Sequence, residues 1–280
     1  MQNIKTMSNT VPPFFYKYTP IEPWLPSLLS GDSILFSARD SFNDPFDSRP
    51  AFKITLETKE GRKFFQEKLK QRTNLTPSQR ILHVQKTAQL QKNATSEDNK
   101  GVEDLLDSTG ILSLATSWEN QLLWAHYAKH HHGICIEFKS DEDLFRMAFK
   151  VTYQDDLPTL LRPQDSPELM INKTFLTKSK CWEYEDEWRV IKVTSTQDEK
   201  DIAYSSNKEM QRLMIDCNGP GIYKFKPSAI SGVTIGMRTT TQDEKFVRDS
   251  MIKLAHGIPL YRTVRSKVKY HVERKLLGIY

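Results

Sequence analysis

Residues 181–190 read CWEYEDEWRV and combine three glutamates, one aspartate and one arginine with three aromatic rings. A surface loop does not need the rings, and a plain core strand does not accept the acids. On extended backbone, alternate side chains point to opposite faces, so the rings and the glutamates are expected on different sides. The two expected faces are Trp182, Tyr184, Asp186 and Trp188 on one side, and Glu183, Glu185, Glu187 and Arg189 on the other. The rings then bury the back of the strand and hold the acids in place at its front.

The acidic face leaves two interpretations open. Carboxylates about 7 Å apart along a strand repel each other unless cations or a ligand meet them. Arg189 and the nearby Lys178 and Lys180 can provide those cations, which gives an ion-pair ladder on an exposed strand. Alternatively, the acids face a cleft, where an E-x-E pair can hold a ribose hydroxyl and stabilise a cationic sugar centre.

The whole chain has the composition of a globular protein. It has 280 residues, of which 38% are hydrophobic and 27% charged, with a net charge of +5. This length suits one domain with an insertion. No apolar run approaches the roughly 18 residues that a membrane span needs, and the N-terminus lacks the apolar core of a signal peptide. The three cysteines are far apart, so neither a disulfide framework nor a zinc-cysteine site is expected. We therefore expect a cytoplasmic protein without a membrane partner, although an effector exported without a signal peptide has the same features.

Hydrophobic alternation and turn residues predict strands mixed with helices. Strands are expected at residues 14–19, 33–38, 111–118, 133–138, 149–153, 187–193, 221–225, 230–236 and 259–266. Helices are expected at about residues 23–29, 119–129 and 241–255 and after Ser166-Pro167, with Ser117 as the cap of the second. The polar stretch 60–108 favours helix, with Thr76-Pro77 at a helix start, and is expected to be an insertion. Because both hairpins and crossovers occur, the expected fold class is α+β.

Residues 42–47 read FNDPFD and predict a turn. Asn43 and Asp44 precede Pro45, and asparagine and aspartate side chains bond nearby backbone groups while proline fixes the following angle. Phe42 and Phe46 flank the polar pair, so we expect the turn to be anchored at the edge of the core with its amides pointing outward.

Residues 118–133 read WENQLLWAHYAKHHHG. On a helix, Trp124 and Tyr127 share one face, which is typical of a core contact. His126 and His130 have the i, i+4 spacing of a zinc-binding helix, but the glutamate that follows the first histidine in metalloproteases is replaced by Tyr127. No metal site is therefore expected, and the histidines are interpreted as caps at the helix end before Gly133.

The C-terminal stretch 261–275 is strongly basic, with six cationic residues against Glu273. If residues 263–270 form a strand, the cations Arg265, Lys267 and Lys269 share one face. Such a stripe can contact nucleic-acid phosphates. It can equally be a solvated edge, where lysine discourages pairing with other strands.

Several motifs together resemble a bacterial family, the domain of unknown function numbered 2971. The resemblance covers roughly residues 14–265, and the family name implies little biochemistry. The motifs are FNDPFD, the W-x-x-Y of Trp124 to Tyr127, the W-x-Y-E-x-E-W-R of Trp182 to Arg189, YKYT, LLSG-x-x-ILFS and ISGVTIG.

The order of elements also resembles an ADP-ribosyltransferase core, whose mixed and antiparallel sheets surround a cleft. This resemblance implies an NAD-consuming enzyme, without a metal, in a toxin, effector or phage-defence role. It implies that Glu187 is the catalytic residue that stabilises positive charge on the ribose as nicotinamide leaves. Glu185 would support the acceptor, which is a protein or a nucleic acid, and the hydroxyls of Thr116 and Ser117 would line the pocket.

The first strand departs from the pattern of that superfamily. An arginine or histidine is expected there to hold the cofactor ribose, but this chain has Lys17 between Tyr16 and Tyr18. Tyr18, Lys17 or Arg39 of the second strand then supplies the contact. The other residues of the expected cofactor-binding set are Asn43 and Tyr127.

Two further interpretations belong to other classes of protein. In a metal-dependent nuclease, four carboxylates would converge on Mg²⁺ and the basic C-terminal stripe would bind nucleic acid. Those carboxylates are Asp44, Asp47, Glu185 and Glu187. In a non-catalytic binding module, the acids and aromatic rings would form a recognition surface.

Overall fold

The computed structural model describes residues 10–54, 56, 59–92, 100–162, 165–194, 218–252 and 257–280, and these form two compact units. Unit 1 comprises Met1–Ser37, Gly110–Lys150 and Tyr184–Tyr280, and unit 2 comprises Ala38–Thr109 and Val151–Glu183. Helices and strands are mixed in both, so the predicted α+β class is confirmed. The organisation as a single domain stays a prediction. Across the described residues, no helix combines the length and the apolarity that crossing a membrane requires.

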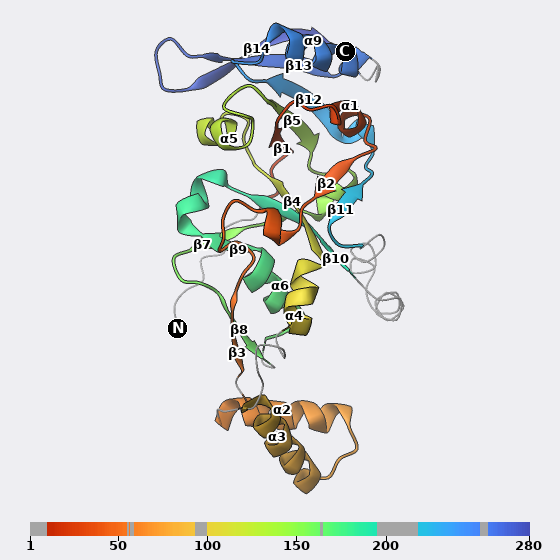
Figure 1. Cartoon of the computed structure of the whole chain (residues 1–280), viewed down its shortest axis with the longest axis vertical. Coiled ribbons are helices and arrows are strands. Elements are labelled where there is room, and N and C mark those ends of the chain that lie inside the picture. Colours follow the sequence, from red (N-terminus) through yellow and green to blue (C-terminus); the bar gives the residue numbers. More distant parts are fainter. Residues whose placement is uncertain are drawn as a thin grey trace. The chain divides into compact units, whose positions relative to one another are not determined.

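A five-stranded sheet is the main element of unit 1 (Figure 1). Its strands, in spatial order, are β1 (Phe14–Thr19), β5 (Ile134–Lys139), β12 (Ile230–Ile235), β13 (Pro259–Arg265) and β14 (Val272–Ile279). β12 and β13 are parallel, and the other neighbours are antiparallel. Parallel neighbours need a long crossover, and helix α9 (Thr241–Ile252) lies in this connection.

The two faces of this sheet bury different residues because side chains alternate along each strand. One face packs on α1 (Leu25–Leu29) and α9 in the larger apolar core. The other face meets α5 (Gln121–His126) in a smaller cluster rich in aromatic rings. On β1, Phe15 belongs to the first core, whereas Tyr16 and Tyr18 belong to the second.

A three-stranded sheet continues unit 1. Its order is β4 (Thr109–Leu114), β10 (Trp188–Val193) and β6 (Phe149–Lys150). Tyr16 of β1 pairs with Ala115, directly after β4, so the two sheets are joined by backbone hydrogen bonds. A short antiparallel ribbon of β2 (Ile34–Phe36) and β11 (Gly221–Tyr223) also belongs to this unit.

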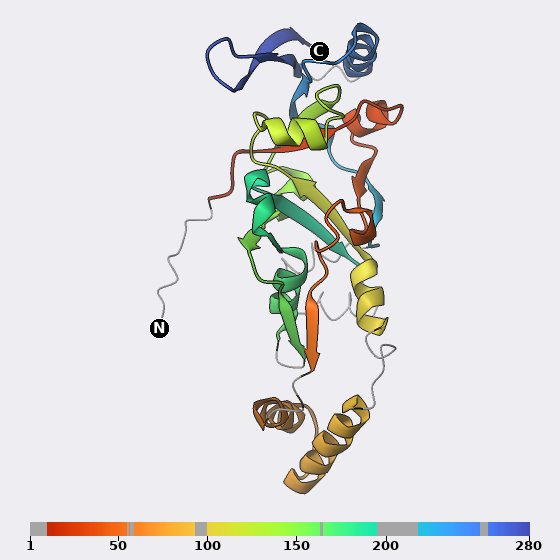
Figure 2. The same cartoon turned by 60° about the vertical axis from the view of Figure 1, so that its left-hand side comes forward.

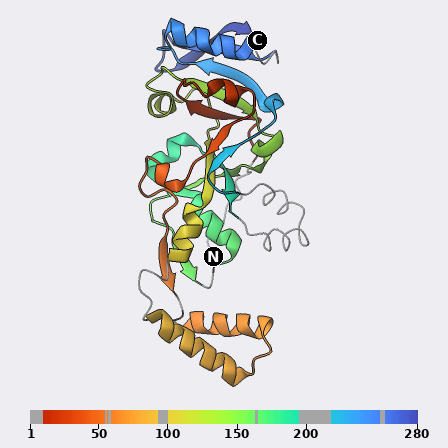
Figure 3. The same ribbon diagram turned by 45° about the vertical axis from the view of Figure 1, so that its right-hand side comes forward.

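The described residues of unit 2 contain two parallel strand pairs and four α-helices. The pairs are β3 (Ala51–Ile54) with β8 (Thr159–Arg162), visible in Figure 2, and β7 (Thr152–Gln154) with β9 (Thr177–Ser179). Three helices occupy the stretch that was expected to be helical, and Figure 3 shows the first two side by side. These are α2 (Lys59–Arg72), α3 (Pro77–Lys92) and α4 (Lys100–Asp107), and the fourth helix is α6 (Pro167–Phe175).

Two of the three predicted helix caps are confirmed. Thr76 and Gln79 bond each other's backbone N–H groups at the start of α3, and the Ser166 hydroxyl accepts from the N–H of Leu169 in α6. The cap predicted at Ser117 is wrong. The side chain of Asn120 accepts from the first N–H groups of α5, which leaves Ser117 in the preceding loop.

The predicted strands 187–193 and 259–266 match β10 and β13, but two stretches beside them that were considered as extended backbone are not strands throughout. Residues 180–185 form a 3₁₀ helix, and the strand starts only at Trp188, so the rings and acids do not alternate across one extended segment. Residues 263–270 are not one strand either. β13 ends at Arg265, a turn follows, and β14 returns along β13. β14 was not expected, and the end of the helix predicted at 241–255 lies partly outside the described residues.

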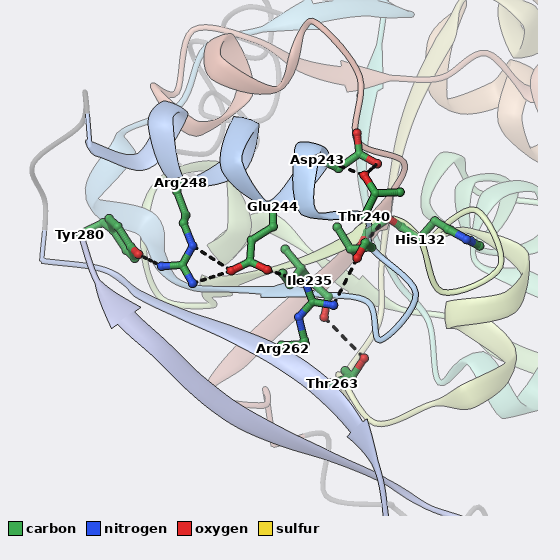
Figure 4. Close-up of polar contacts among 11 residues, drawn as sticks. His132, Ile235, Thr240, Asp243, Glu244, Arg248, Arg262, Thr263 and Tyr280 are labelled. Atoms are coloured by element: carbon green, nitrogen blue, oxygen red, sulfur yellow. Dashed lines mark hydrogen bonds and ion pairs between the residues drawn. The ribbon is translucent and has the colours of Figure 1, made fainter.

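The side chain of Glu244 joins α9 to the sheet beneath it (Figure 4). Its carboxylate accepts hydrogen bonds from Arg248 on the same helix at 2.5 Å and from Arg262 of β13 at 2.5 Å. Arg248 also bonds the hydroxyl of Tyr280. Burial raises the pKa of Glu244, but the hydrogen bonds from the two arginines outweigh it and hold the pKa below its ordinary value.

We predict that Glu244→Gln lowers the free energy of unfolding by about 1–3 kcal/mol at pH 7, because it removes charge-assisted hydrogen bonds. Since the folded-state pKa is lowered, this contribution is complete above the ordinary pKa of about 4.3 and is lost as the pH falls below it. Urea unfolding at pH 7 and pH 3 measures the difference between wild type and variant. Asp249→Asn, an exposed acid on the same helix, is the control and should change stability by less than about 0.5 kcal/mol.

Candidate functional site

The acids of the quoted stretch lie where the 3₁₀ helix η4 (Lys180–Glu185) gives way to β10. Asp186 joins the two elements with a φ of 41°, a left-handed conformation that aspartate tolerates better than most residues. This turn breaks the alternation of an extended chain. As a result, Glu185, Asp186 and Glu187 have three different partners and do not form one repulsive face.

Glu187 forms a buried ion pair with Arg189. The Nε of Arg189 donates to one carboxylate oxygen at 2.8 Å, and its Nη2 donates to the other at 3.0 Å. Glu187 is 3% exposed and Arg189 is fully buried. A two-point contact of this kind fixes the orientation of the carboxylate and compensates part of the cost of removing both charges from water.

Lys17 of β1 lies in the electric field of these acids. Its Nζ donates to the carbonyl oxygen of Ser113 in β4 at 3.1 Å. Burial lowers the pKa of Lys17, and the carboxylates of Glu187 and Glu185 oppose this change. The lysine that replaces the expected arginine or histidine of the first strand therefore interacts electrostatically with both glutamates of the E-x-E pair, while its hydrogen bond goes to Ser113.

The remaining acids are bound to the loop and helix that follow β4. The hydroxyl of Tyr127 donates to Glu185 at 2.7 Å, and Glu185 is 6% exposed. Thr116 donates to Asp186 at 2.5 Å, and Lys150 of β6 approaches the other oxygen of Asp186 at 3.2 Å. The predicted residues Thr116, Tyr127 and Glu185 thus share one polar cluster with Lys17 and Glu187.

Tyr18 and Ser117 meet on the other side of β1. The hydroxyl of Tyr18 donates to the carbonyl oxygen of Ser117 at 2.8 Å, and its ring meets Trp124 edge-on at a centroid distance of 5.2 Å. Burial raises the pKa of Tyr18, so the hydroxyl keeps its proton. Because Tyr18 and Lys17 are consecutive on a strand, they point to opposite faces. Tyr18 supports the aromatic cluster rather than the acids.

Arg39 and Asn43 belong to unit 2. Arg39 is 3% exposed and donates to Asp107 at 2.6 Å and to Glu103, both at α4. Asn43 is exposed. The next residue, Asp44, accepts from the N–H of Phe46 at 2.9 Å, as expected for this turn. Phe46 itself is 67% exposed, so the prediction that both phenylalanines anchor the turn in the core is wrong.

The carboxylates proposed for a nuclease are divided between the units. Asp44 and Asp47 lie in unit 2, where Asp47 approaches Lys178 at 3.7 Å, and Glu185 and Glu187 lie in unit 1. Within the described residues, no three or more His, Cys, Asp or Glu side chains are grouped so that they could hold a metal ion.

Three residues of this cluster, Arg189, Asp186 and Lys150, were not singled out as site residues from the sequence. Arg189 was considered as a cation beside the glutamates, but its burial requires the three-dimensional structure. Asp186 was assigned to the aromatic face, and Lys150 is distant in sequence. The pattern E-x-R at the start of a strand was the available signal for the Glu187–Arg189 pair.

The fold and this cluster define an α+β protein with a buried acidic and basic cluster at the entry to an inner strand. Residues 123–190 match the model of the family described as "Protein of unknown function (DUF2971)". The matched segment includes Trp124, Tyr127 and the W-x-Y-E-x-E-W-R motif, so the resemblance noted from the sequence is confirmed for residues 123–190. Its extension to residues 14–265 stays a prediction. Among curated proteins and among solved structures, no match to this chain was found.

Trp124 packs in the aromatic cluster that Tyr127 also contacts. Its ring is completely buried, and its Nε1 donates to the carbonyl oxygen of Trp118 at 2.7 Å. We predict that Trp124→Ala lowers the free energy of unfolding by about 3–5 kcal/mol, because it leaves a large cavity and an unsatisfied carbonyl group. Chemical denaturation measures this loss. Leu122→Ala, on an exposed position of the same helix, is the control, and a Trp124→Ala protein as stable as this control would contradict a core role.

Proposed function

We propose that the cluster around Glu187 cleaves NAD between the ribose and nicotinamide, as an ADP-ribosyltransferase does. The observation that carries the proposal is Lys17, a first-strand cation whose Nζ is fixed by a hydrogen bond to Ser113 at 3.1 Å. Burial lowers its pKa, and the carboxylates of Glu187 and Glu185 oppose this change. In the superfamily that the sequence resembles, a first-strand cation and an E-x-E pair act on the same ribose.

In this proposal Glu187 is the catalytic residue. The bond from the ribose carbon to the nicotinamide nitrogen breaks, its electron pair leaves with nicotinamide, and positive charge develops on the ribose. A carboxylate held in a fixed orientation stabilises such charge without reorganising during the reaction. Arg189 supplies that fixed orientation through its two hydrogen bonds.

Glu185 orients the attacking group in this proposal, and Tyr127 is its positioning residue. The hydroxyl of Tyr127 donates to Oε1 of Glu185. Thr116, Lys17 and the partly exposed Asp186 supply polar groups of the kind that bind ribose hydroxyls. NAD is the substrate, and water or an acceptor nucleophile receives the ADP-ribosyl group.

The pairing of the strands in unit 1 supports this proposal. β1 is joined to β5 by antiparallel pairing and to the end of β4 by the Tyr16–Ala115 bridge. The first strand, the hydroxyl-bearing end of β4 and the glutamates before β10 are therefore neighbours in one unit. We also propose that the sheets of this unit are arranged as in an ADP-ribosyltransferase.

The test is nicotinamide release from NAD by the full chain. We predict that Glu187→Gln lowers the rate on the order of 10²–10³-fold, because the charge is lost while the shape is kept. Glu183→Gln is the matched control, since Glu183 is an exposed acid in the same segment, and it should keep the wild-type rate.

Stability is measured beside activity because Glu187→Gln also removes the partner of a buried arginine. Rates are compared at a temperature at which circular dichroism shows every variant folded. Glu185→Gln keeps an acceptor for the Tyr127 hydroxyl and should reduce transfer to an acceptor more than hydrolysis of NAD. If wild type releases no nicotinamide, or if folded Glu187→Gln releases it at the wild-type rate, the proposal is wrong.

A further inference from the structure

The turn between β13 and β14 borders an open pocket of about 870 Å³ in unit 1. This volume is in the range of pockets that hold a ligand of nucleotide size. The residues around the pocket come from the start of α5, the loop after it, the loop after β12 and the turn itself. They are Gln121, His131, Met237, Arg238, Arg265, Ser266, Lys267, Val268, Lys269, Tyr270, His271 and Val272.

The pocket is positively charged. Its lining contains four arginine and lysine side chains, which are Arg238, Arg265, Lys267 and Lys269, and no carboxylate. Within the part of the chain that the structure describes, none of these four forms an ion pair. By contrast, Arg262 and Arg274 on the same two strands are paired, with Glu244 and Glu137. Carboxylates therefore neutralise Arg262 and Arg274, whereas the four cations that line the pocket keep their positive charge.

An aromatic ring is exposed among these cations. Tyr270 is fully exposed and Val268 is 85% exposed, and both alternate with lysines in the turn. The backbone beneath the ring is held in place, because the side chain of Gln121 donates to the carbonyl oxygen of Tyr270 at 2.8 Å. The N–H of Ser266 also bonds the carbonyl oxygen of His271 across the turn. An exposed ring on a backbone that is held in place offers a flat face on which a base can stack.

His131 also lines the pocket. Burial lowers the pKa of His131, and the charge of Arg238 lowers it further, so the neutral ring is favoured. The ring stacks on Trp124 at a centroid distance of 6.2 Å. Its Nδ1 is buried, and the described residues offer it no hydrogen-bond partner. His131 is therefore a neutral aromatic part of the lining beside the four cations.

We propose that this pocket binds single-stranded nucleic acid, with phosphates on Arg265, Lys267 and Lys269 and an unpaired base on Tyr270. Non-specific single-strand sites combine a cationic groove with aromatic stacking in this way. A duplex hides the faces of its bases and cannot use the ring, so the exposed tyrosine favours a single strand. The surface contains none of the residues assigned to NAD cleavage, and its test does not depend on that activity.

The experiment measures the affinity of the full chain for a fluorescent single strand of twelve thymidines by anisotropy, between 50 and 200 mM salt. We expect Tyr270→Ala to weaken binding by roughly 5- to 100-fold, because it removes one stacking partner. Lys267→Gln combined with Lys269→Gln should reduce the slope of log K against log salt by about 1.4, since each phosphate contact contributes about 0.7 for single strands.

Matched controls separate this site from general attraction to a basic protein. Lys275→Gln removes an exposed cation of β14 outside the pocket and should change the affinity less than twofold. Tyr270→Phe keeps the ring and should bind like wild type. The substituted positions in the turn are exposed, so melting temperatures should stay within a few degrees. No binding, unchanged affinity of Tyr270→Ala, or equally tight binding of a duplex of the same length would each overturn the proposal.

Discussion

The buried ion pair between Glu187 and Arg189 is the interaction on which the arrangement of unit 1 around β10 depends. Arg189 is among the largest completely buried side chains, and a guanidinium at that depth is costly unless a carboxylate meets it with good geometry. The two hydrogen bonds meet this requirement. Arg189 can therefore lie in the core at the start of β10 only because Glu187, two residues before it, reaches its guanidinium. The turn at Asp186 places the Glu187 carboxylate in that position.

The same constraint explains how β1 divides the surrounding side chains. Lys17 donates to Ser113 and interacts electrostatically with Glu187 and Glu185, whereas Tyr16 and Tyr18 belong to the aromatic cluster beside α5. Tyr127, at the end of α5, connects the two environments through its hydroxyl on Glu185. The rings of the quoted stretch thus do not form the back of a strand. The carboxylates are held by partners from the loop after β4, the end of α5, β6 and β10.

Much of the fold of this unit was predictable from the sequence because its strands follow simple alternation. β1, β5, β12 and β13 were expected within a few residues of their observed bounds, as was the helical stretch that contains α2 and α3. The failures come from local polar chemistry. The 3₁₀ helix before β10 depends on a positive φ at Asp186, and alternation does not reveal it. β14 reads VERKLLGI and groups its charged and its apolar residues instead of alternating them, so its strand character comes from pairing with β13.

The candidate site was predictable in part. Glu185, Glu187, Thr116, Tyr127 and Lys17 were named from the sequence and share one cluster. Except for Glu187 and Arg189, which are two residues apart, their partners are long-range contacts. Thr116 and Asp186 are 70 residues apart and Lys17 and Ser113 are 96 apart, and pattern alone does not determine such pairs. The basic residues of the β13–β14 turn were also singled out. Their association with Arg238, from another loop, required the structure.

The most direct measurement of the central claim is a double-mutant cycle on the ion pair, with Glu187→Gln, Arg189→Met and both together in urea unfolding. Each single change removes one charge of the buried pair and should cost roughly 3–5 kcal/mol. The double variant should lose much less than the sum, leaving a coupling energy of about 1.5 kcal/mol or more. Costs that add to within about 0.5 kcal/mol, as for independent sites, would contradict the account.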